Sequence, residues 1–316
     1  MTVLYTLETK KGLTINMERR YLGKTGLLVS RLGVGLAEIG QFSPASDVSL
    51  ISQLVNTAIE HGLNFFDTAS CYGHSEELLG KALLHNREKV IIATKAGHAL
   101  DSMTRSWTYE TIRNSIERSL KRLNTEYIDI VQLHSCDVDV LKQGEVIRAL
   151  QEAKQQGKTR FIGYSGDNES AGWAVESDIF DTLQTSFNIV DQKARSQLLP
   201  KAVEHEMGII VKRPIANAAW AAAQNPSAYA GEYFRRSKKM IGDNSLPTNS
   251  THPLVISLDF VFAHNAIDVA IVGTKNPVHM QNNINWVEND LPIDKTIVQR
   301  WEQKFDEVGS DWSQQN

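Results

Sequence analysis

The chain has 316 residues, of which 41% are hydrophobic and 22% charged, and its formal net charge is −4. This composition is typical of a globular protein, and the weak negative charge gives no reason to expect a nucleic acid or a membrane surface as partner. Two cysteines, Cys71 and Cys136, are too few for a disulfide framework, so we expect a reducing, cytoplasmic location.

Residues 1–17 carry no readable pattern, and we interpret them as a possible flexible extension before one domain that covers 18–316. They lack a basic flank followed by an apolar run, so we expect no signal peptide. No apolar run elsewhere is long enough to span a bilayer. The stretch 18–30 predicts a short hairpin that turns near residues 24–26.

From residue 31 onwards, short apolar stretches alternate with segments of helical periodicity. The expected strands are 31–36, 64–68, 90–95, 128–134, 160–165, 182–187, 208–213 and 269–274. The expected helices are 47–61, 75–85, 108–123, 143–156, 168–176, 192–206, 252–264, 277–287 and finally 294–307, which a polar tail follows. We interpret the polar segment 217–250 as irregular, either a solvated face or a mobile lid over the site.

The expected strands are apolar on both faces, as parallel strands must be when both sides are covered. Eight strand–helix units predict a single-domain α/β protein of the (β/α)₈ barrel type. The N-terminal hairpin, the long loop after the seventh strand and the extra C-terminal helix are additions to that barrel. An open doubly wound sheet is the alternative, but it usually has a glycine fingerprint. The segment 33–40, GVGLAEIG, lacks the fingerprint because Glu38 stands where the third glycine is required.

Polar residues stand at the ends of neighbouring predicted strands. The stretch 64–80, NFFDTASCYGHSEELLG, has Asp67 at the end of its strand and Tyr72 in the turn that follows. Lys95 ends the third strand and His134 the fourth. Because barrel enzymes have their active sites at the carboxyl ends of the strands, we expect these four side chains to lie together. Each one alone could also be a turn residue, a rim lysine or a core histidine.

These four residue types suit one reaction. A free tyrosine has a pKa of about 10, and a nearby cation lowers that pKa. Lys95 can be the cation, and Asp67 can keep the buried lysine charged. His134 can donate a hydrogen bond to a carbonyl oxygen while Tyr72 protonates the same oxygen. The hydride must come from a cofactor, because no side chain supplies one.

The pattern D-T-A-x-x-Y-G-x-S-E-x-x-L-G in this stretch resembles the signature of the aldo-keto reductases, and the resemblance extends from roughly residue 18 to residue 288. It implies a catalytic tetrad of Asp67, Tyr72, Lys95 and His134. It also implies NADPH as cofactor, usually in preference to NADH, bound without a Rossmann fold. We expect no metal ion at the site.

The resemblance implies the cofactor contacts less evenly. Ser165 and Gln184 match the residues that hold the nicotinamide amide in the family, but Gly166 replaces an asparagine. Lys212 or Arg213 stands where many members stack an aromatic ring. We expect this position to stack on the cofactor through an arginine plane or to reach a phosphate.

The segment 273–283, GTKNPVHMQNN, resembles the adenosine 2′-phosphate site of the family. Thr274 and Lys275 would contact the phosphate, since hydroxyl groups and a cation at a helix start suit an anion. A neutral imidazole at His279 would weaken the preference for NADPH, so NADH is possible. The complete set of expected cofactor contacts is Gly35, Ser165, Gly166, Gln184, Lys212, Arg213, Pro214, Ile215, Gly273, Thr274, Lys275, His279, Asn282 and Asn283.

Three aromatic residues, Trp107, Trp220 and Tyr229, are candidate walls of the substrate pocket. The alternative is that they are loop aromatics packed onto the barrel. We interpret Cys71 as a small packing residue, with a redox-sensitive thiol as the alternative.

The sequence therefore predicts an NADPH-dependent oxidoreductase that reduces a small aldehyde or ketone to an alcohol, or catalyses the reverse oxidation, with Tyr72 as general acid or base. One alternative is a cofactor-binding regulatory or interaction subunit, which would bind NADPH with little turnover. The other is a lyase or aldolase that uses Lys95 as a Schiff base, which would react without a nicotinamide.

Overall fold

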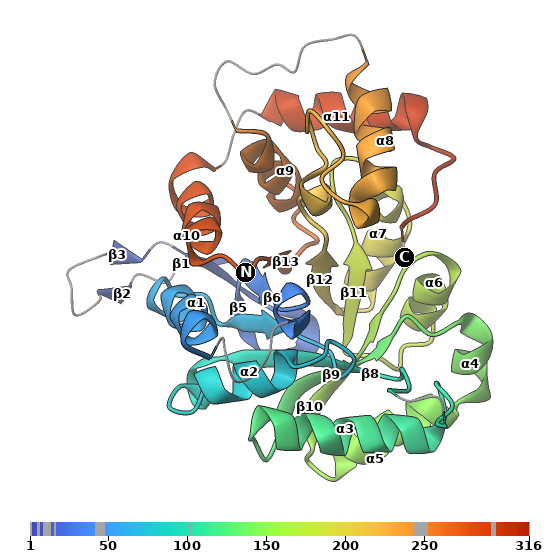
Figure 1. Cartoon of the computed structure of the whole chain (residues 1–316). Helices are drawn as coiled ribbons and strands as arrows, with labels where there is room; N and C mark the ends of the chain where they lie inside the picture. Colours follow the sequence, from blue (N-terminus) through green and yellow to red (C-terminus); the bar gives the residue numbers. More distant parts are fainter. Residues whose placement is uncertain are drawn as a thin grey trace.

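The computed structural model describes residues 2–4, 7–8, 14–15, 17–41, 48–100, 103–242, 252–291 and 295–315. Within them, eight parallel strands close into a barrel in the order β10, β11, β12, β13, β6, β7, β8, β9, and helices surround it (Figure 1). The strands are β6 (Leu32–Gly35), β7 (Phe65–Asp67), β8 (Ile91–Ala96), β9 (Ile128–His134), β10 (Thr159–Ser165), β11 (Thr182–Ser186), β12 (Gly208–Lys212) and β13 (Val269–Gly273). The predicted (β/α)₈ barrel is confirmed.

A small antiparallel sheet lies at the amino-terminal end of the barrel. It consists of β1 (Thr2–Leu4), β4 (Glu18–Tyr21) and β5 (Leu28–Ser30), with β4 in the middle. The hairpin of β4 and β5 agrees with the prediction for 18–30. Lys24 N in its turn donates to Glu206 O, two residues before β12 begins. Leu22 and Val29 belong to the buried cluster inside the barrel, so the hairpin closes this end and leaves the opposite rim for the site.

Successive strand residues point alternately into the barrel and towards the helices. In β7, Phe65 belongs to the inner cluster with Ile91 and Ile130, whereas Phe66 belongs to the outer cluster that joins strands to helices. Both phenylalanines are fully buried. Burial on both faces explains why the strands read as continuous apolar runs.

Nine predicted helices have counterparts. They are α1 (Val48–Glu60), α2 (Ser75–Ala82), α3 (Tyr109–Leu123), α5 (Glu145–Gln155), α6 (Asn168–Glu176), α7 (Leu198–Glu204), α9 (Pro253–Phe262), α10 (Pro277–Asn285) and α11 (Lys295–Val308). The α-helix α7 is shorter than the predicted 192–206. Pro200 is tolerated only in a first helical turn, which places the helix start near residue 198.

Two α-helices in the described part of the chain were not predicted. The six residues of α4 (Val138–Gln143) are too few for a readable period. The segment 217–250, expected to be irregular, contains α8 (Gly231–Ile241), so that prediction is wrong for residues 231–241. Arg236 and Ser237 lie among the buried residues of α8, and these polar side chains hide its periodicity. Figure 1 shows α8 beside α11. No helix among the described residues is long and apolar enough to cross a membrane.

Candidate active site

The four predicted catalytic residues lie together at the carboxyl ends of β7, β8 and β9. Lys95 Nζ donates to Asp67 Oδ2 over 2.5 Å and to Thr68 O over 2.9 Å. The Lys95 nitrogen is 5.1 Å from the centre of the Tyr72 ring. The rings of Tyr72 and His134 meet edge to face, with centres 5.6 Å apart. The barrel therefore brings a phenol, an ammonium, a carboxylate and an imidazole to one place.

The loop that carries Tyr72 is held from two sides. Ser70 N donates to Lys95 O, and Tyr72 N donates to Ala69 O. On the other side, the loop touches the backbone of Gly40, where an added Cβ would lie 1.9 Å from Tyr72 O. Gly73 has a φ of +50°, a conformation that favours glycine. These contacts fix the backbone on which the phenol is mounted.

The pKa values of Lys95 and Tyr72 are both raised, but for different reasons. Burial acts to lower the pKa of Lys95, but Asp67 and Tyr72 outweigh it and the net pKa is raised. Lys95 is therefore an ammonium at neutral pH, as expected. We also expected a lowered pKa for Tyr72, and that net direction is wrong. Burial of the phenol raises the pKa of Tyr72, and Lys95 opposes this rise without cancelling it.

Ser165 and Gln184 lie directly behind this pair. Gln184 Nε2 donates to Asp67 Oδ1 over 2.7 Å, and Gln184 Oε1 accepts a hydrogen bond from Ser165 Oγ over 2.8 Å. Both predicted nicotinamide contacts are thus continuous with the tetrad. Gly166, the next predicted contact, is buried, and its N–H donates to Gln184 O.

His134 is a neutral imidazole in this setting. Burial and the nearby Lys95 charge lower the pKa of His134 well below its usual value. Its Nδ1 lies 3.4 Å from Cys71 Sγ. The ring of His98, a residue that the sequence interpretation missed, is 4.9 Å from the His134 ring. Trp107 packs on His98 at 4.8 Å, which places this predicted wall beside the tetrad.

The end of β12 carries two cations, both already bound within the protein. Lys212 Nζ is 2.7 Å from Asp167 Oδ2. Arg213 donates to Ser186 Oγ and to the Tyr229 hydroxyl. Tyr229, a predicted wall, is 67% exposed at the rim. Stacking of the Arg213 guanidinium on the cofactor, as expected from the sequence, would therefore compete with these hydrogen bonds.

Trp220 does not reach the rim, so its assignment as a pocket wall is wrong. It is 1% exposed, and its indole packs edge to face on Trp301 of α11 with ring centres 4.6 Å apart. The alternative, an aromatic residue packed onto the barrel, describes it.

The polar tail after α11 also reaches the site. Gln314 is 4% exposed, and its side-chain amide donates to Thr185 Oγ1 and Ser186 O. Its side-chain oxygen accepts from Asn168 N. Gln315 O accepts hydrogen bonds from Arg213 and Ser186. The tail thus covers the ends of β11 and β12.

The remaining predicted cofactor contacts lie directly after β12, at the ends of β6 and β13, and from there into α10. Pro214 is buried and Ile215 half-buried after β12. Gly35 and Gly273 are paired in neighbouring strands, and an added Cβ on Gly35 would lie 3.3 Å from Gly273 N. Side chains at these two positions would narrow the rim between the strands.

Side chains of the turn from β13 into α10 accept hydrogen bonds from its own backbone. Thr274 is buried, and Asn276 caps α10 by accepting from Val278 N over 2.9 Å. Lys275, His279 and Asn282 are exposed, whereas Asn283 is buried. The predicted contacts here include hydroxyl, amide and ammonium groups and no carboxylate, so the donor set fits the phosphate end of a dinucleotide.

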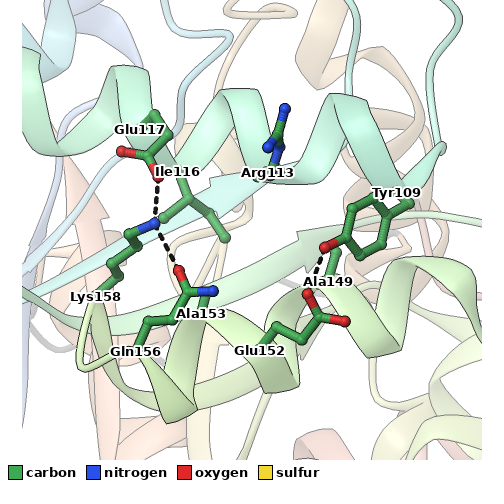
Figure 2. Close-up of a pocket in the computed structure, with 9 residues that line it drawn as sticks. All are labelled: Tyr109, Arg113, Ile116, Glu117, Ala149, Glu152, Ala153, Gln156 and Lys158. Atoms are coloured by element: carbon green, nitrogen blue, oxygen red, sulfur yellow. Dashed lines mark hydrogen bonds and ion pairs between the residues drawn. The ribbon is translucent and has the colours of Figure 1, made fainter.

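Figure 2 shows a pocket that lies elsewhere, on the outer surface between α3 and α5. Tyr109 donates to Glu152 there, and Lys158 pairs with Glu117. These helix surface residues already satisfy one another, and none of them belongs to the strand ends. We assign this pocket no part in the site.

Comparison with known proteins agrees with this geometry. The family model described as "Aldo/keto reductase family" matches residues 31–305. An uncharacterized oxidoreductase of Bacillus subtilis is 28% identical over 85% of this chain and 90% of its own length. An L-galactose dehydrogenase of Arabidopsis thaliana is 42% identical, over 48% of this chain and 49% of its own length.

Solved structures of aldo-keto reductases are also similar to this chain. A putative aldo-keto reductase from Pseudomonas aeruginosa has a TM-score of 0.69 and 30% identity, covering 87% of this chain and 95% of its own. An aldo-keto reductase from Bacillus halodurans, in its holo form, has a TM-score of 0.76 over 91% of this chain and 96% of its own. Because the Bacillus halodurans protein is only 24% identical to this chain, its similarity supports the fold alone.

Proposed function

The chain belongs to the aldo/keto reductase family, and from this premise we propose that it is a cytoplasmic NADPH-dependent enzyme that reduces an aldehyde or ketone to the alcohol, or catalyses the reverse oxidation. The observation that supports this most is the buried Lys95–Asp67 ion pair beside Tyr72 and His134. A small-molecule carbonyl at this rim would meet a proton donor and a hydrogen-bond donor at once.

Tyr72 is the general acid of the proposed reduction. Its raised pKa keeps the phenol protonated at neutral pH, which is the form that an acid needs. As electron density moves onto the carbonyl oxygen, the phenol proton passes to that oxygen and the nearby Lys95 ammonium stabilises the phenolate left behind. In the oxidation, the same phenolate accepts the alcohol proton.

Lys95, Asp67 and His134 prepare that proton transfer. Asp67 keeps Lys95 charged inside the barrel. Gln184 in turn holds Asp67 in place through its hydrogen bond, and Ser165 holds Gln184. His134 is neutral, so one of its nitrogens carries a proton that can orient the carbonyl oxygen towards Tyr72.

NADPH, when bound, supplies the hydride that no side chain can provide. Thr274 and Lys275 would hold its 2′-phosphate at the start of α10, and Asn282 and Asn283 would hold the adenine. Lys212 and Arg213 would supply positive charge near the nicotinamide end. A relative from Escherichia coli bears the name NADH-specific methylglyoxal reductase, so the preference between NADPH and NADH within the family needs direct measurement.

Tryptophan-fluorescence titration with NADPH and with NADH tests the proposal first. A panel of aldehydes, ketones and sugars with the preferred cofactor then tests turnover. We expect tighter binding of NADPH and measurable reduction of at least one carbonyl. Failure of both nicotinamides to bind would exclude the proposal, whereas binding without any turnover would favour the regulatory subunit.

A further inference from the structure

Cys71 contacts one of the two ring nitrogens of His134. Its Sγ lies 3.4 Å from Nδ1, within hydrogen-bond distance for sulfur. Two arrangements satisfy this contact. The thiol can donate to Nδ1, or Nδ1–H can donate to sulfur. The choice decides whether the other nitrogen, Nε2, carries the ring proton or a lone pair.

The chemistry of the two groups favours the thiol as donor. Burial raises the pKa of the Cys71 thiol, so it keeps its hydrogen at neutral pH. Burial and Lys95 keep the His134 ring neutral, so it has a single proton. A thiol sulfur is a weak acceptor, whereas an unprotonated imidazole nitrogen is a good one. The arrangement S–H to Nδ1 therefore uses the better acceptor.

Neither partner can move easily out of this contact. The Cys71 backbone lies in the loop pinned by the bond from Ser70 N to Lys95 O. Ser70 O also accepts from Arg122. On the other side, Ser135 N donates to Ser165 O directly after His134. The His98 ring bonds the His134 backbone as well.

We propose that Cys71 is a positioning residue for His134. Its S–H donates to Nδ1, which places the ring proton on Nε2 and makes that nitrogen the hydrogen-bond donor to the substrate carbonyl. This role rests on the proposed function, since a donor at Nε2 matters only if a carbonyl oxygen binds there. It replaces the interpretation of Cys71 as a packing residue.

The direct test reads the tautomer and needs no turnover. Nitrogen NMR of protein labelled at histidine distinguishes Nδ1–H from Nε2–H, and the spectrum of a His134→Gln variant assigns the signal. We expect the Nε2–H tautomer for His134 in the unaltered protein at pH 7. Cys71→Ala should give a mixture of tautomers, and Cys71→Ser, which restores a donor, should return to Nε2–H.

Kinetics supply the second readout. Cys71→Ala and Cys71→Val should lower kcat for carbonyl reduction about tenfold, less than the loss of a whole oxyanion donor, with NADPH affinity unchanged. Cys71→Ser should recover most of kcat. Cys136→Ala, which removes the other cysteine, is the control and should change neither the tautomer nor kcat.

The outcomes separate this inference from the proposed function. An Nδ1–H tautomer in the unaltered protein, or an unchanged tautomer in Cys71→Ala, would overturn the role of Cys71 even if the enzyme reduces carbonyls normally. Absence of nicotinamide binding would instead remove the proposed function, and the tautomer result would then stand as a structural fact about His134.

Discussion

The Lys95 ammonium donates to the Asp67 carboxylate over 2.5 Å, and the two side chains are 2% and 4% exposed. A buried ion pair of this kind contributes little net stability, because desolvation of both ions offsets their attraction. Its position, with Lys95 Nζ 5.1 Å from the Tyr72 ring, points instead to control of the charge around the phenol. The predictions below start from this pair.

Tyr72→Phe removes the proposed acid while the aromatic ring still fills its place. We expect kcat for carbonyl reduction to fall roughly 10²–10⁴-fold, the usual effect of a positioned general acid. NADPH affinity should stay the same, since the phenol lies at the reacting end. Tyr21→Phe on β4, an exposed position, is the matched control and should retain full activity. Turnover that survives Tyr72→Phe would contradict the mechanism.

Asp191 should make the stability of the protein depend on pH. It is fully buried, and burial raises its pKa from 3.8 to about 7, although Arg236 opposes the rise. Because the folded pKa is raised, the folded state holds more protons than the unfolded chain between those two values. The contribution of Asp191 is therefore fully present below the unfolded pKa and is lost as the pH rises through about 7.

Asp191→Asn should remove this dependence. This shift in the pKa of Asp191 corresponds to roughly 4 kcal/mol of folding free energy at most. In Asp191→Asn, the plot of unfolding free energy against pH should therefore have a clearly less negative slope between pH 4 and pH 7. Urea unfolding at several pH values measures it. Asp139→Asn, on the exposed surface, serves as control, and an equal change of slope in that variant would argue against Asp191.

Gln314→Ala should loosen the tail from the rim. The substitution removes bonds to Thr185, Ser186 and Asn168 and leaves buried polar groups unpaired. We expect a loss of about 1–3 kcal/mol in the free energy of unfolding, the usual cost of such groups. Urea unfolding measures it, with Gln151→Ala on the exposed face of α5 as control. Equal free energies of unfolding for the two variants would show that the hydrogen bonds of the tail do not contribute to stability.

The parts of this site that could be predicted are those carried by strand ends. Asp67, Lys95 and His134 end neighbouring strands, so the barrel topology alone brings them together. Apolar strands also revealed the barrel, because burial on both faces leaves a pattern in the residues themselves.

The parts that could not be predicted depend on contacts far along the chain. Gln314 bonds Asn168, 146 residues away, and a polar tail carries no sign of its destination. Trp220 was misplaced because a loop tryptophan does not show whether it faces the rim or the core. The pKa of Tyr72 was misjudged because the degree of burial, which outweighs Lys95, follows only from the folded structure.

Lys275→Met should change the preference between the two nicotinamide cofactors. Lys275 is exposed in the turn before α10, where its charge would meet the 2′-phosphate that NADPH has and NADH lacks. Exposure to solvent screens such a contact, so we expect the Kd for NADPH to rise only about five- to tenfold. The Kd for NADH should stay nearly the same, because NADH has no phosphate at that position.

Fluorescence titration measures both dissociation constants, and Lys121→Met on the exposed face of α3 controls for the loss of one positive charge. Equal weakening of both cofactors would mean that Lys275 contacts a part that they share, and the 2′-phosphate would then have to be sought at another residue.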